Sequence, residues 1–505
     1  MSHKFSLINL GCPKNLVDSD NLAEKLISSG LSRVDNPENA DLLFINTCGF
    51  IQDAKKESIE EILKLAEIKK GQKKMQDAGY MMQDKKNRAS CIVNHESKDN
   101  NKKLIVFGCL AKRYRDELTK EIPDIDAIFG VGEDERIIEY CKGIRGLRGL
   151  TSGESPRRQG VKGSSKTMIH SLEPSNPRTL EPVRPYSYLK IAEGCSRKCA
   201  YCVIPSIKGK YKSVTPDEIL KKADSRINAG VKELILIAQD TASYGKEFKG
   251  YDIAALLKDL CLIKGDFWIR LLYAYPASIT DSLLSVIAGE EKICKYLDIP
   301  FQHSEDRILK LMKRGGSRKG HLDLIRKIRR AIPDMALRTT FIAGFPTETE
   351  DEFNSMMDFI EEAQFDRLGA FKYSKEEGTP AAQLKGHLSE EVKNRRFDTI
   401  MRRQADISLK KNKALIGRRF KALIDEIDNG IAVGRLYSHA PEIDGVVIIE
   451  DTRYRMQDSG YKTQDKRNRA SCIVHHASLK LKIGAFVTVE ITDVYDYDLK
   501  GTIVI

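Results

Sequence analysis

Strand-like runs alternate with helical segments over residues 185–412, and this alternation restricts the fold more than any other feature of the chain. Helical segments such as PDEILKKADSRINAG and RKGHLDLIRKIRRAI separate the runs. Six βα units at this spacing predict a partial (βα)6 barrel, an incomplete relative of the eight-stranded form. The six runs are YSYLKIAEGC, ELILIAQD, WIRLLYAYP, YLDIPFQH, ALRTTFIAGFP and RLGAFKYS.

Polar or conformationally special residues gather where these runs end. Because parallel strands finish at the same edge of a sheet, that edge is where α/β folds build their sites. We therefore expect one face of the barrel to be its mouth. The residues at the run ends are Gln239, Asp240, Tyr275, Pro276, Gln302, His303, Gly344 and Pro346.

The first part of the chain carries three further strand-like runs, and each ends in a cysteine. KFSLINLGC ends at Cys12, DLLFINTC at Cys48 and KLIVFGC at Cys109. Helical segments between them predict an α/β domain with a parallel sheet. The three thiols then follow the carboxyl ends of parallel strands, where they can meet in space.

The composition changes twice more along the chain. Residues 143–184 lose apolar periodicity and gather Gly, Ser, Pro and Arg, as linkers do, and the last 90 or so residues carry short β-branched runs broken by Gly and Asp turns. The latter pattern predicts a small antiparallel β-barrel. The expected regions are 3–142 for the first domain, 143–184 for the linker, 185–412 for the partial barrel and 413–505 for the small barrel.

Two near-identical 23-residue segments, 75–97 and 456–478, match at 17 positions yet interrupt unrelated parts of the chain. Two copies so far apart cannot stack into a repeat architecture. We interpret them as one peptide inserted twice into loops, where added length costs little closure entropy. The alternative is an extra metal site built from their Cys and His residues: Cys91, His95, Cys472, His475 and His476.

Cys195, Cys199 and Cys202 lie within eight positions at the end of the first barrel run. A structural zinc site normally takes four protein ligands, whereas a four-iron cluster held by three thiolates leaves one iron open. The missing fourth ligand therefore predicts a [4Fe–4S] cluster whose open iron binds a substrate or cofactor. A zinc knuckle and buried free thiols are the alternatives.

Composition bears on the partners, the cysteine chemistry and the location of the protein. The net charge of +12 is compatible with an anionic partner such as RNA or a ribosome, and equally with solvated lysine-rich helices. Eleven cysteines without a secretory signal indicate thiol or metal chemistry rather than a disulfide scaffold. Since no apolar run is long enough to cross a bilayer, we expect a cytoplasmic protein that does not enter a membrane.

GCSRKCAYC followed by six βα units resembles the radical S-adenosylmethionine (radical SAM) superfamily. The resemblance implies that SAM occupies the open iron and is cleaved reductively to methionine and a 5′-deoxyadenosyl radical. The barrel then holds SAM and excludes water. Secondary candidates for the SAM and substrate pocket are Tyr201, Gln239, Asp240, His303 and Gly344.

LGCPKN, NTCGF and VFGCLA resemble the cysteine motifs of methylthiotransferases, and the last region resembles the TRAM module of these enzymes. The resemblance implies that Cys12, Cys48 and Cys109 hold a second [4Fe–4S] cluster that takes part in supplying sulfur. Its open iron then faces that of the first cluster. The cysteines outside these motifs and the inserted segments are interpreted as ordinary residues: Cys141, Cys261 and Cys294.

Within this family, DIPFQHSEDRILKLMKRGGSR and YSKEEGTPAA resemble the branch that methylthiolates the β-carbon of an aspartate on the twelfth small-subunit ribosomal protein. The chain departs from that branch at Phe301, where Leu is usual, and at Thr347, where Gly is usual. The implied partners are the ribosomal protein or particle and an electron donor such as flavodoxin or ferredoxin, and we expect a monomer. The alternatives are a tRNA adenosine as substrate, or an RNA- or ribosome-binding protein with structural or sensing clusters.

Overall fold

The computed structural model describes residues 3–71, 102–144, 184–428, 431–450 and 481–504. The chain forms two compact units, residues 1–179 and 180–505, and each is described by itself. Both inserted segments lie outside the described residues, as does nearly all of the expected linker. The expected domain boundaries stay predictions. Among the described helices, none combines the length and the apolar character that crossing a membrane requires.

The first unit is built on a five-stranded parallel sheet in the order β2-β1-β3-β4-β5. The register pairs Thr47 with Gly108, so the residues that follow them, Cys48 and Cys109, leave neighbouring strands at the same level. The strands are β1 (Lys4–Asn9), β2 (Ser32–Arg33), β3 (Leu42–Thr47), β4 (Lys103–Gly108) and β5 (Ala127–Ile128).

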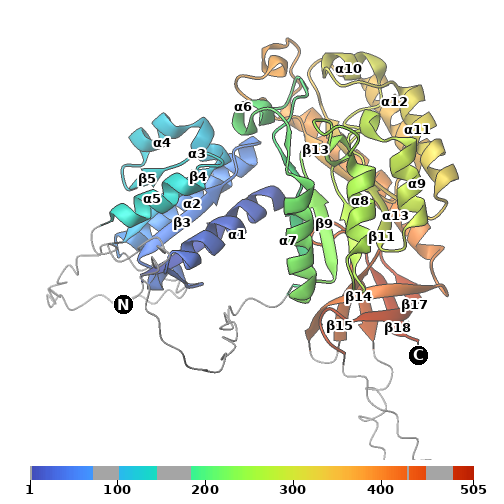
Figure 1. Ribbon diagram of the computed structural model, residues 1–505. Coiled ribbons are helices and arrows are strands. Elements are labelled where there is room, and N and C mark those ends of the chain that lie inside the picture. The colour runs from blue at the N-terminus through green and yellow to red at the C-terminus, as the bar shows by residue number, and fades with distance from the viewer. Residues whose placement is uncertain (1–2, 72–101, 145–183, 429–430, 451–480, 505) are drawn as a thin grey trace, which may run out of the picture. The chain divides into compact units, whose positions relative to one another are not determined.

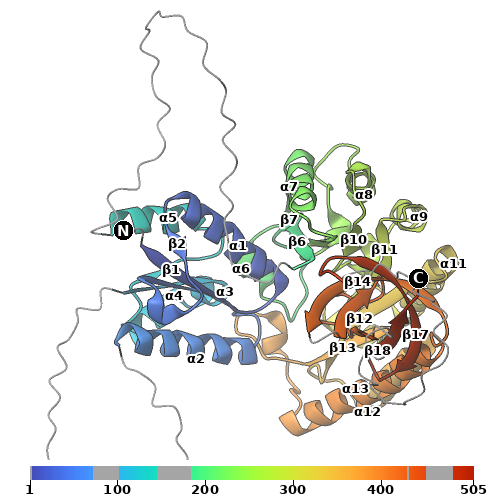
Figure 2. The ribbon, with the colours of Figure 1, turned by 90° about the horizontal axis from the view of Figure 1, so that it is seen from below.

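Helices cover both faces of this sheet, with α1 and α5 on one side and α2 on the other (Figure 2). Leu22 and Leu26 of α1 pack with Ile137 of α5, whereas Ile62 and Leu65 of α2 belong to the opposite core. The predicted parallel α/β sheet is confirmed. The helices are α1 (Pro13–Ser28), α2 (Gln52–Lys69), α3 (Cys109–Arg113), α4 (Arg115–Glu121) and α5 (Asp134–Gly143), with a 3₁₀ turn η1 (Pro37–Asn39).

The second unit contains a six-stranded sheet in the order β13-β12-β11-β10-β9-β6, and every pairing is parallel (Figure 1). All six predicted strand runs take part, so the expected partial barrel is confirmed. The strands are β6 (Tyr186–Lys190), β9 (Glu233–Ile237), β10 (Trp268–Leu271), β11 (Ile293–Asp298), β12 (Ala336–Ala343) and β13 (Arg367–Lys372).

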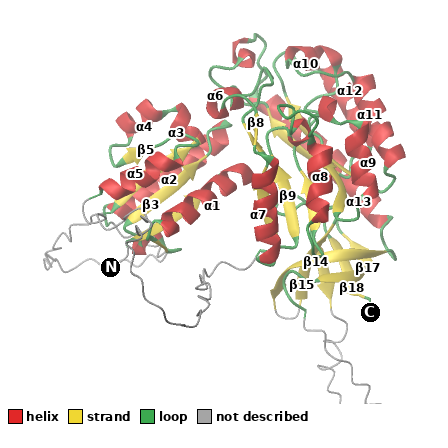
Figure 3. Cartoon of the chain, in the orientation of Figure 1, coloured by secondary structure: helices red, strands yellow, loops and turns green. Residues whose placement is uncertain are grey.

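A helix follows each of these strands before the next begins (Figure 3). Their apolar faces pack on the sheet in one continuous core. The helices are α7 (Pro216–Asn228), α8 (Ile253–Leu262), α9 (Asp281–Gly289), α10 (Asp306–Leu311), α11 (Arg318–Ala331), α12 (Glu350–Ala363) and α13 (Glu390–Lys413). The 3₁₀ turns are η2 (Thr241–Ser243), η3 (Pro276–Ser278) and η4 (Pro380–Gln383).

The first predicted run is not one continuous strand. β6 ends at Lys190, and β7 (Ala192–Glu193) pairs antiparallel with β8 (Lys212–Ser213) in a separate two-stranded ribbon. The short helix α6 (Ile204–Lys208) lies between them. The segment that carries Cys195, Cys199 and Cys202 is thus a loop closed at its base by this ribbon.

The end of the chain forms a closed five-stranded barrel, as predicted. Four of its pairings are antiparallel, but β16 and β18 are parallel. Apolar side chains from all five strands fill the interior. The strands are β14 (Arg419–Asp428), β15 (Ile431–Leu436), β16 (Val447–Glu450), β17 (Phe486–Val494) and β18 (Leu499–Ile503).

A buried ionic seam joins this barrel to the six-stranded sheet. Glu233 of β9 accepts hydrogen bonds from Arg270 of β10, at 2.6 Å, and from Arg435 of β15, at 2.5 Å. Both Glu233 and Arg270 are fully buried. The indole of Trp268 packs on the Phe486 ring with centroids 4.9 Å apart. We call these five residues the seam.

Candidate functional site

The loop that carries Cys195, Cys199 and Cys202 has no helix or strand of its own between β7 and α6, and backbone hydrogen bonds from distant segments hold it. The amide of Ala200 donates to the carbonyl of Met312 at 2.8 Å, and the Ala200 carbonyl accepts from the Ala381 amide at 2.8 Å. The loop conformation is therefore set by residues more than a hundred positions downstream.

Gly194 begins this loop in the left-handed region, with φ of +77°. A Cβ atom there would lie 2.3 Å from the carbonyl oxygen of Lys210, so only glycine fits. The next residue, Cys195, donates its amide to the Gly209 carbonyl at 3.0 Å. The close approach of these two chain segments orients the first thiol of the trio.

The three thiols are partly buried. Burial raises the pKa of the Cys195 thiol and raises that of Cys202 to about 12, so these two thiols carry protons when no metal is bound. Metal binding then has to release these protons, because the thiolate is the ligand. The sulfur of Cys199 has a cationic neighbour, since Nη1 of Arg314 lies 3.8 Å from its Sγ.

Arg314 connects this sulfur to two aromatic rings. Its Nη1 donates to the Tyr201 hydroxyl at 3.3 Å, and its guanidinium lies over the Tyr275 ring. The Arg197 guanidinium also lies over Tyr275, 3.5 Å from the ring centroid. We did not anticipate Arg314 from the sequence, although it lies in the LMKRGGSR segment that supports the family resemblance.

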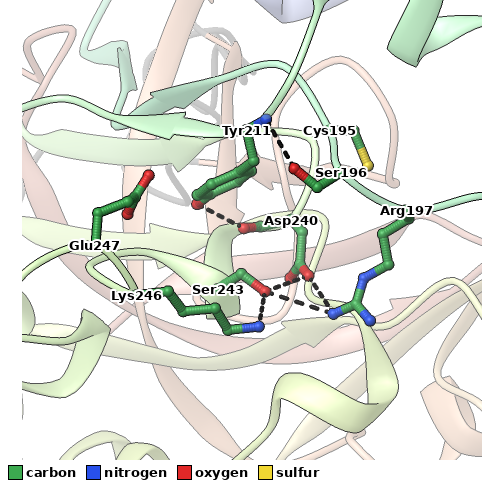
Figure 4. A pocket seen from close by; sticks show the side chains of 8 residues that line it. All are labelled: Cys195, Ser196, Arg197, Tyr211, Asp240, Ser243, Lys246 and Glu247. Atoms are coloured by element: carbon green, nitrogen blue, oxygen red, sulfur yellow. Dashed lines mark hydrogen bonds and ion pairs between the residues drawn. The ribbon is translucent and has the colours of Figure 1, made fainter.

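Asp240 lies at the wall of a cavity of about 320 Å³ beside Cys195 (Figure 4). Its Oδ2 accepts hydrogen bonds from Arg197 at 2.8 Å and from Ser243 at 2.5 Å, and its Oδ1 accepts from the Tyr275 amide at 3.2 Å. Because both carboxylate oxygens are occupied, Asp240 holds Arg197, a residue of the thiol loop, in place. The full lining is Cys195, Ser196, Arg197, Tyr211, Asp240, Ser243, Lys246 and Glu247.

Lys246 adds a second positive charge to this cavity. Its Nζ donates to Ser243 at 2.8 Å. Figure 4 draws this bond, and Lys246 as a whole is exposed. Glu247 faces the ribbon, where it accepts from the amide and the hydroxyl of Ser213 at 2.9 and 2.7 Å. Burial alone would raise the pKa of Glu247, but these hydrogen bonds outweigh it and lower that pKa. The cavity thus presents two cations near the first thiol.

The other predicted pocket residues have mainly protein partners. Gln239 donates to Glu193 at 3.4 Å, and its Oε1 is buried without a hydrogen-bond partner in the described part of the chain. Gly344, with φ of +75°, packs against Lys393, where a Cβ would lie 2.5 Å from a side-chain carbon. His303 is fully buried and accepts from the Glu305 amide at 3.0 Å. Their roles stay predictions.

Three non-glycine residues with positive φ follow successive strands at the mouth of the partial barrel. They are Tyr273 after β10 (φ +64°), Gln302 after β11 (φ +74°) and Thr347 after β12 (φ +68°). Such backbone strain costs about 1–3 kcal/mol per residue and gathers at functional sites. Thr347, where a glycine is usual in the family, is held by hydrogen bonds from Arg307 to its hydroxyl and carbonyl.

Phe301, the second departure from the family pattern, is fully buried one residue before the strained Gln302. Its ring packs on His321 with centroids 4.5 Å apart, and it also contacts Phe359 and Phe365. The extra volume relative to leucine fills an aromatic cluster below the mouth.

The chain segments that directly follow β1, β3 and β4 converge at one edge of the first unit. A Cβ on Gly11 would lie 3.0 Å from Sγ of Cys48, and the Cys109 thiol lies 3.7 Å from Oδ1 of Asn15. Asn15 also donates to the carbonyl of Leu10 at 3.0 Å. Cys48 and Cys109 are buried whereas Cys12, the N-terminal neighbour of α1, is exposed.

Neither trio converges on a single point. Within the described residues, no three His, Cys, Asp or Glu side chains are arranged to hold one metal ion. A [4Fe–4S] cluster does not require such convergence, because each thiolate binds a different iron of the cube. The cysteines in the described ranges are all free of disulfides.

Known proteins match this chain region by region. The radical SAM superfamily matches residues 189–360, the uncharacterized protein family UPF0004 matches residues 4–94, and the TRAM domain matches residues 416–504. The ribosomal protein uS12 methylthiotransferase RimO of Thermodesulfovibrio yellowstonii is 50% identical over 503 residues, which cover 99% of each chain. The chain belongs to the RimO family.

Other members of this family are also similar over nearly the whole chain. RimO of Thermoanaerobacter sp. is 40% identical over 98% of each chain, and RimO of Clostridioides difficile is 40% identical over 99% of this chain and 98% of its own.

The solved structure of the radical SAM methyltransferase TsrM from Kitasatospora setae covers 90% of this chain and 81% of its own, with 12% identity and a TM-score of 0.48.

Membership of the RimO family identifies the chain as a radical SAM enzyme of the methylthiotransferase type, and the family implies [4Fe–4S] clusters and SAM as cofactors. The chemistry of the two cysteine trios fits these cofactors. Each offers three soft sulfur donors, one fewer than a closed four-iron site needs, and the loop of the second unit adjoins a cavity with two cationic side chains.

Proposed function

We propose that this enzyme replaces a β-hydrogen of an aspartate on ribosomal protein uS12 with a methylthio group. The observation that carries the proposal is the loop with three thiols and no fourth, at the carboxyl-end mouth of a parallel half-barrel. Eight relatives with 37–50% identity are named as uS12 methylthiotransferases, which favours the ribosomal protein over the tRNA alternative.

Cys195, Cys199 and Cys202 are proposed to bind the cluster that cleaves SAM. When bound, cluster and SAM supply the radical that takes a hydrogen atom from the target carbon. Arg314 donates toward the Cys199 sulfur and places a positive charge beside it. Arg197, held by Asp240, fixes the loop between the first two thiols and places a positive charge where the carboxylate of a bound molecule is favoured.

Cys12, Cys48 and Cys109 are proposed to hold the second cluster, which takes part in supplying sulfur. Asn15 supports this trio, because its side-chain amide fixes the Leu10 carbonyl beside Cys12 while its oxygen contacts the Cys109 thiol. Transfer requires that the substrate reach both clusters in one reaction cycle. SAM also supplies the methyl group of the product in this proposal.

The partners follow from this reaction. We propose that a small-subunit particle or the free ribosomal protein docks on the enzyme, with the net charge of +12 favouring a particle rich in RNA. Flavodoxin or ferredoxin is the proposed electron donor, and the enzyme is proposed to act as a monomer in the cytoplasm.

The deciding experiment is anaerobic reconstitution followed by mass analysis of the product. The enzyme is loaded with iron and sulfide and incubated with SAM, a reductant and either uS12 or tRNA. We expect one methylthio increment on an aspartate-containing uS12 peptide, no increment on tRNA, and formation of 5′-deoxyadenosine. An increment on tRNA instead would establish the alternative substrate, and the absence of 5′-deoxyadenosine would favour a binding protein.

Alanine variants test which thiols bind the two clusters. Replacing any one of the six proposed ligands should abolish the product and lower the iron content. Cys261→Ala is the matched control, because Cys261 is a partly buried cysteine outside both trios. A variant of either trio that keeps full iron content and turnover would remove that cysteine from the proposed site.

A further inference from the structure

A second cavity, of about 270 Å³, lies at the opposite end of the sheet from the three-thiol loop. It adjoins the amino ends of β12 and β13, and both α13 and the terminal barrel contribute to it. The proposed methylthiolation does not use it. The lining residues that matter here are Arg329, Arg367, Lys411, Arg418, Asp334 and Asp366.

The two carboxylates of this lining do not neutralise its four cations. Oδ1 of Asp366 pairs with Lys411 at 2.6 Å, and its Oδ2 accepts from the Leu337 amide at 2.8 Å. Asp334 lies 3.9 Å from Arg418, and both side chains are more than half exposed, so this pair contributes little. Positive charge therefore exceeds negative charge inside the cavity.

The other two cations of the lining are Arg329 and Arg367. Neither forms an ion pair with any residue in the described ranges. Arg329 donates through Nη2 to the backbone carbonyl of Gln364 at 2.7 Å. Burial lowers the pKa of Arg329 and that of Lys411, although the carboxylate of Asp366 opposes the shift in both.

Arg367 is only 6% exposed, and its Nε is buried without a hydrogen-bond partner in the described part of the chain. Its Nη1 donates to the Asp366 carbonyl at 2.9 Å, and its Nη2 lies 2.6 Å from Nε2 of His439. A guanidinium can only donate, so His439 accepts and its ring is neutral. Burial lowers the pKa of His439 in agreement. Arg367 thus brings a nearly buried guanidinium, which no carboxylate of the described residues pairs with, to the lining of the cavity.

We propose that this cavity is a binding site for a phosphate group, which Arg329 and Arg367 hold by charge-assisted hydrogen bonds. Guanidinium groups match the oxygens of phosphate in geometry as well as in charge. The volume is below the roughly 300–1,000 Å³ of pockets that enclose drug-sized ligands, so the site takes an inorganic ion or a terminal phosphate rather than a whole nucleotide.

The test is isothermal titration of the full-length, cluster-loaded enzyme with inorganic phosphate, at an ionic strength held constant with chloride. We expect saturable binding that weakens about tenfold or more in Arg329→Gln, because a hydrogen bond to a charged group is lost. Arg330→Gln is the matched control, since Arg330 is the next residue of α11, is exposed and does not line the cavity. It should bind phosphate as the wild type does.

A second arm separates the two sources of phosphate. A short RNA with a 5′-terminal phosphate is compared with the same RNA lacking that phosphate, each in competition with inorganic phosphate. Competition by the phosphorylated RNA alone assigns the site to a terminal phosphate, whereas competition by neither assigns it to the free ion. Both results support the site.

Two results would overturn the proposal: no saturable binding of inorganic phosphate, or equal weakening by Arg329→Gln and Arg330→Gln, which would indicate a general charge effect. Circular dichroism checks that Arg329→Gln folds. If it does not, Arg418→Gln at the more exposed rim replaces it, with a smaller loss of affinity expected and unchanged affinity counting against the site. Methylthiolation of uS12 is assayed separately, so failure of one proposal leaves the other standing.

Discussion

Glu233→Gln should weaken the seam more than the loss of any single exposed ion pair would weaken the second unit. The substitution keeps the size of the side chain but removes the only carboxylate that pairs with Arg270 in the described residues. Removing one partner of a buried ion pair leaves an uncompensated charge and costs about 3–5 kcal/mol. Arg435 keeps its second partner, Asp425, at 2.6 and 2.9 Å, which holds the loss within that range.

The chain has its own reporter for this loss. Trp268, the single tryptophan of the sequence, is almost fully buried and packs on Phe486 across the seam. Its fluorescence in urea therefore follows the separation of the barrel from the sheet. With an m-value of about 2 kcal/mol per M, a loss of about 4 kcal/mol lowers the urea midpoint by about 2 M.

Asp266→Asn is the matched control, because Asp266 pairs with Lys421 across the same boundary at 2.7 Å but both side chains are roughly half exposed. It should cost no more than about 1 kcal/mol. If Glu233→Gln shifts the midpoint no further than Asp266→Asn does, the buried pair does not stabilise the seam and the reasoning is refuted.

The pH dependence gives an independent check. Burial alone would raise the pKa of Glu233, but Arg270 and Arg435 outweigh it and hold that pKa below its usual value. The carboxylate therefore stabilises the fold fully above the unfolded pKa of about 4.3, and this contribution is lost as the pH falls through the lower folded value. The difference between wild type and Glu233→Gln should be largest near neutral pH and shrink in acid.

Three further predictions concern the mouth of the partial barrel. Arg314→Gln should lower the midpoint potential of the cluster in the second unit by on the order of tens of millivolts, since a donor to its sulfur is lost; redox titration followed by electron paramagnetic resonance, in protein lacking the N-terminal thiols, measures this, and an unchanged potential would contradict it. Gly194→Ala should lower the iron content after reconstitution, whereas Gly209→Ala, with the same sign of φ but no atom within 4 Å of the new Cβ, should keep it. Thr347→Gly should raise the stability of the apo-protein by about 1 kcal/mol, because glycine adopts positive φ without strain. Thermal unfolding measures this, and a variant less stable than the wild type would contradict it.

The repeating elements of this fold can be predicted from the sequence because they follow local periodicity. All six strand runs of the partial barrel and the three cysteine-ending strands form as expected, and the predicted small barrel closes with five strands. The break of the first run at Ile191 cannot be predicted from the sequence, since the turn into β7 depends on pairing with β8 some twenty residues later. The parallel pairing of β16 with β18 likewise depends on how the barrel closes.

The candidate site can be predicted from the sequence only where a single segment carries all the residues of a motif. The motif with three thiols spans eight residues, so the sequence alone predicts a cluster there. The ion pair between Arg197 and Asp240, 43 positions apart, and the contact of Arg314 with Cys199, 115 positions apart, depend on tertiary folding. No local pattern marks such pairs, so side-chain partners at the mouth emerge only from the three-dimensional structure.

The anchoring of the thiol loop has a consequence for the order of biosynthesis. Its central residue, Ala200, is fixed by the backbones of Met312 and Ala381, which leave the ribosome long after the loop itself. Until residue 381 has emerged, the nascent chain lacks the scaffold that shapes this loop. Maturation of the cluster proposed for this loop is therefore expected to follow, rather than accompany, synthesis of most of the polypeptide.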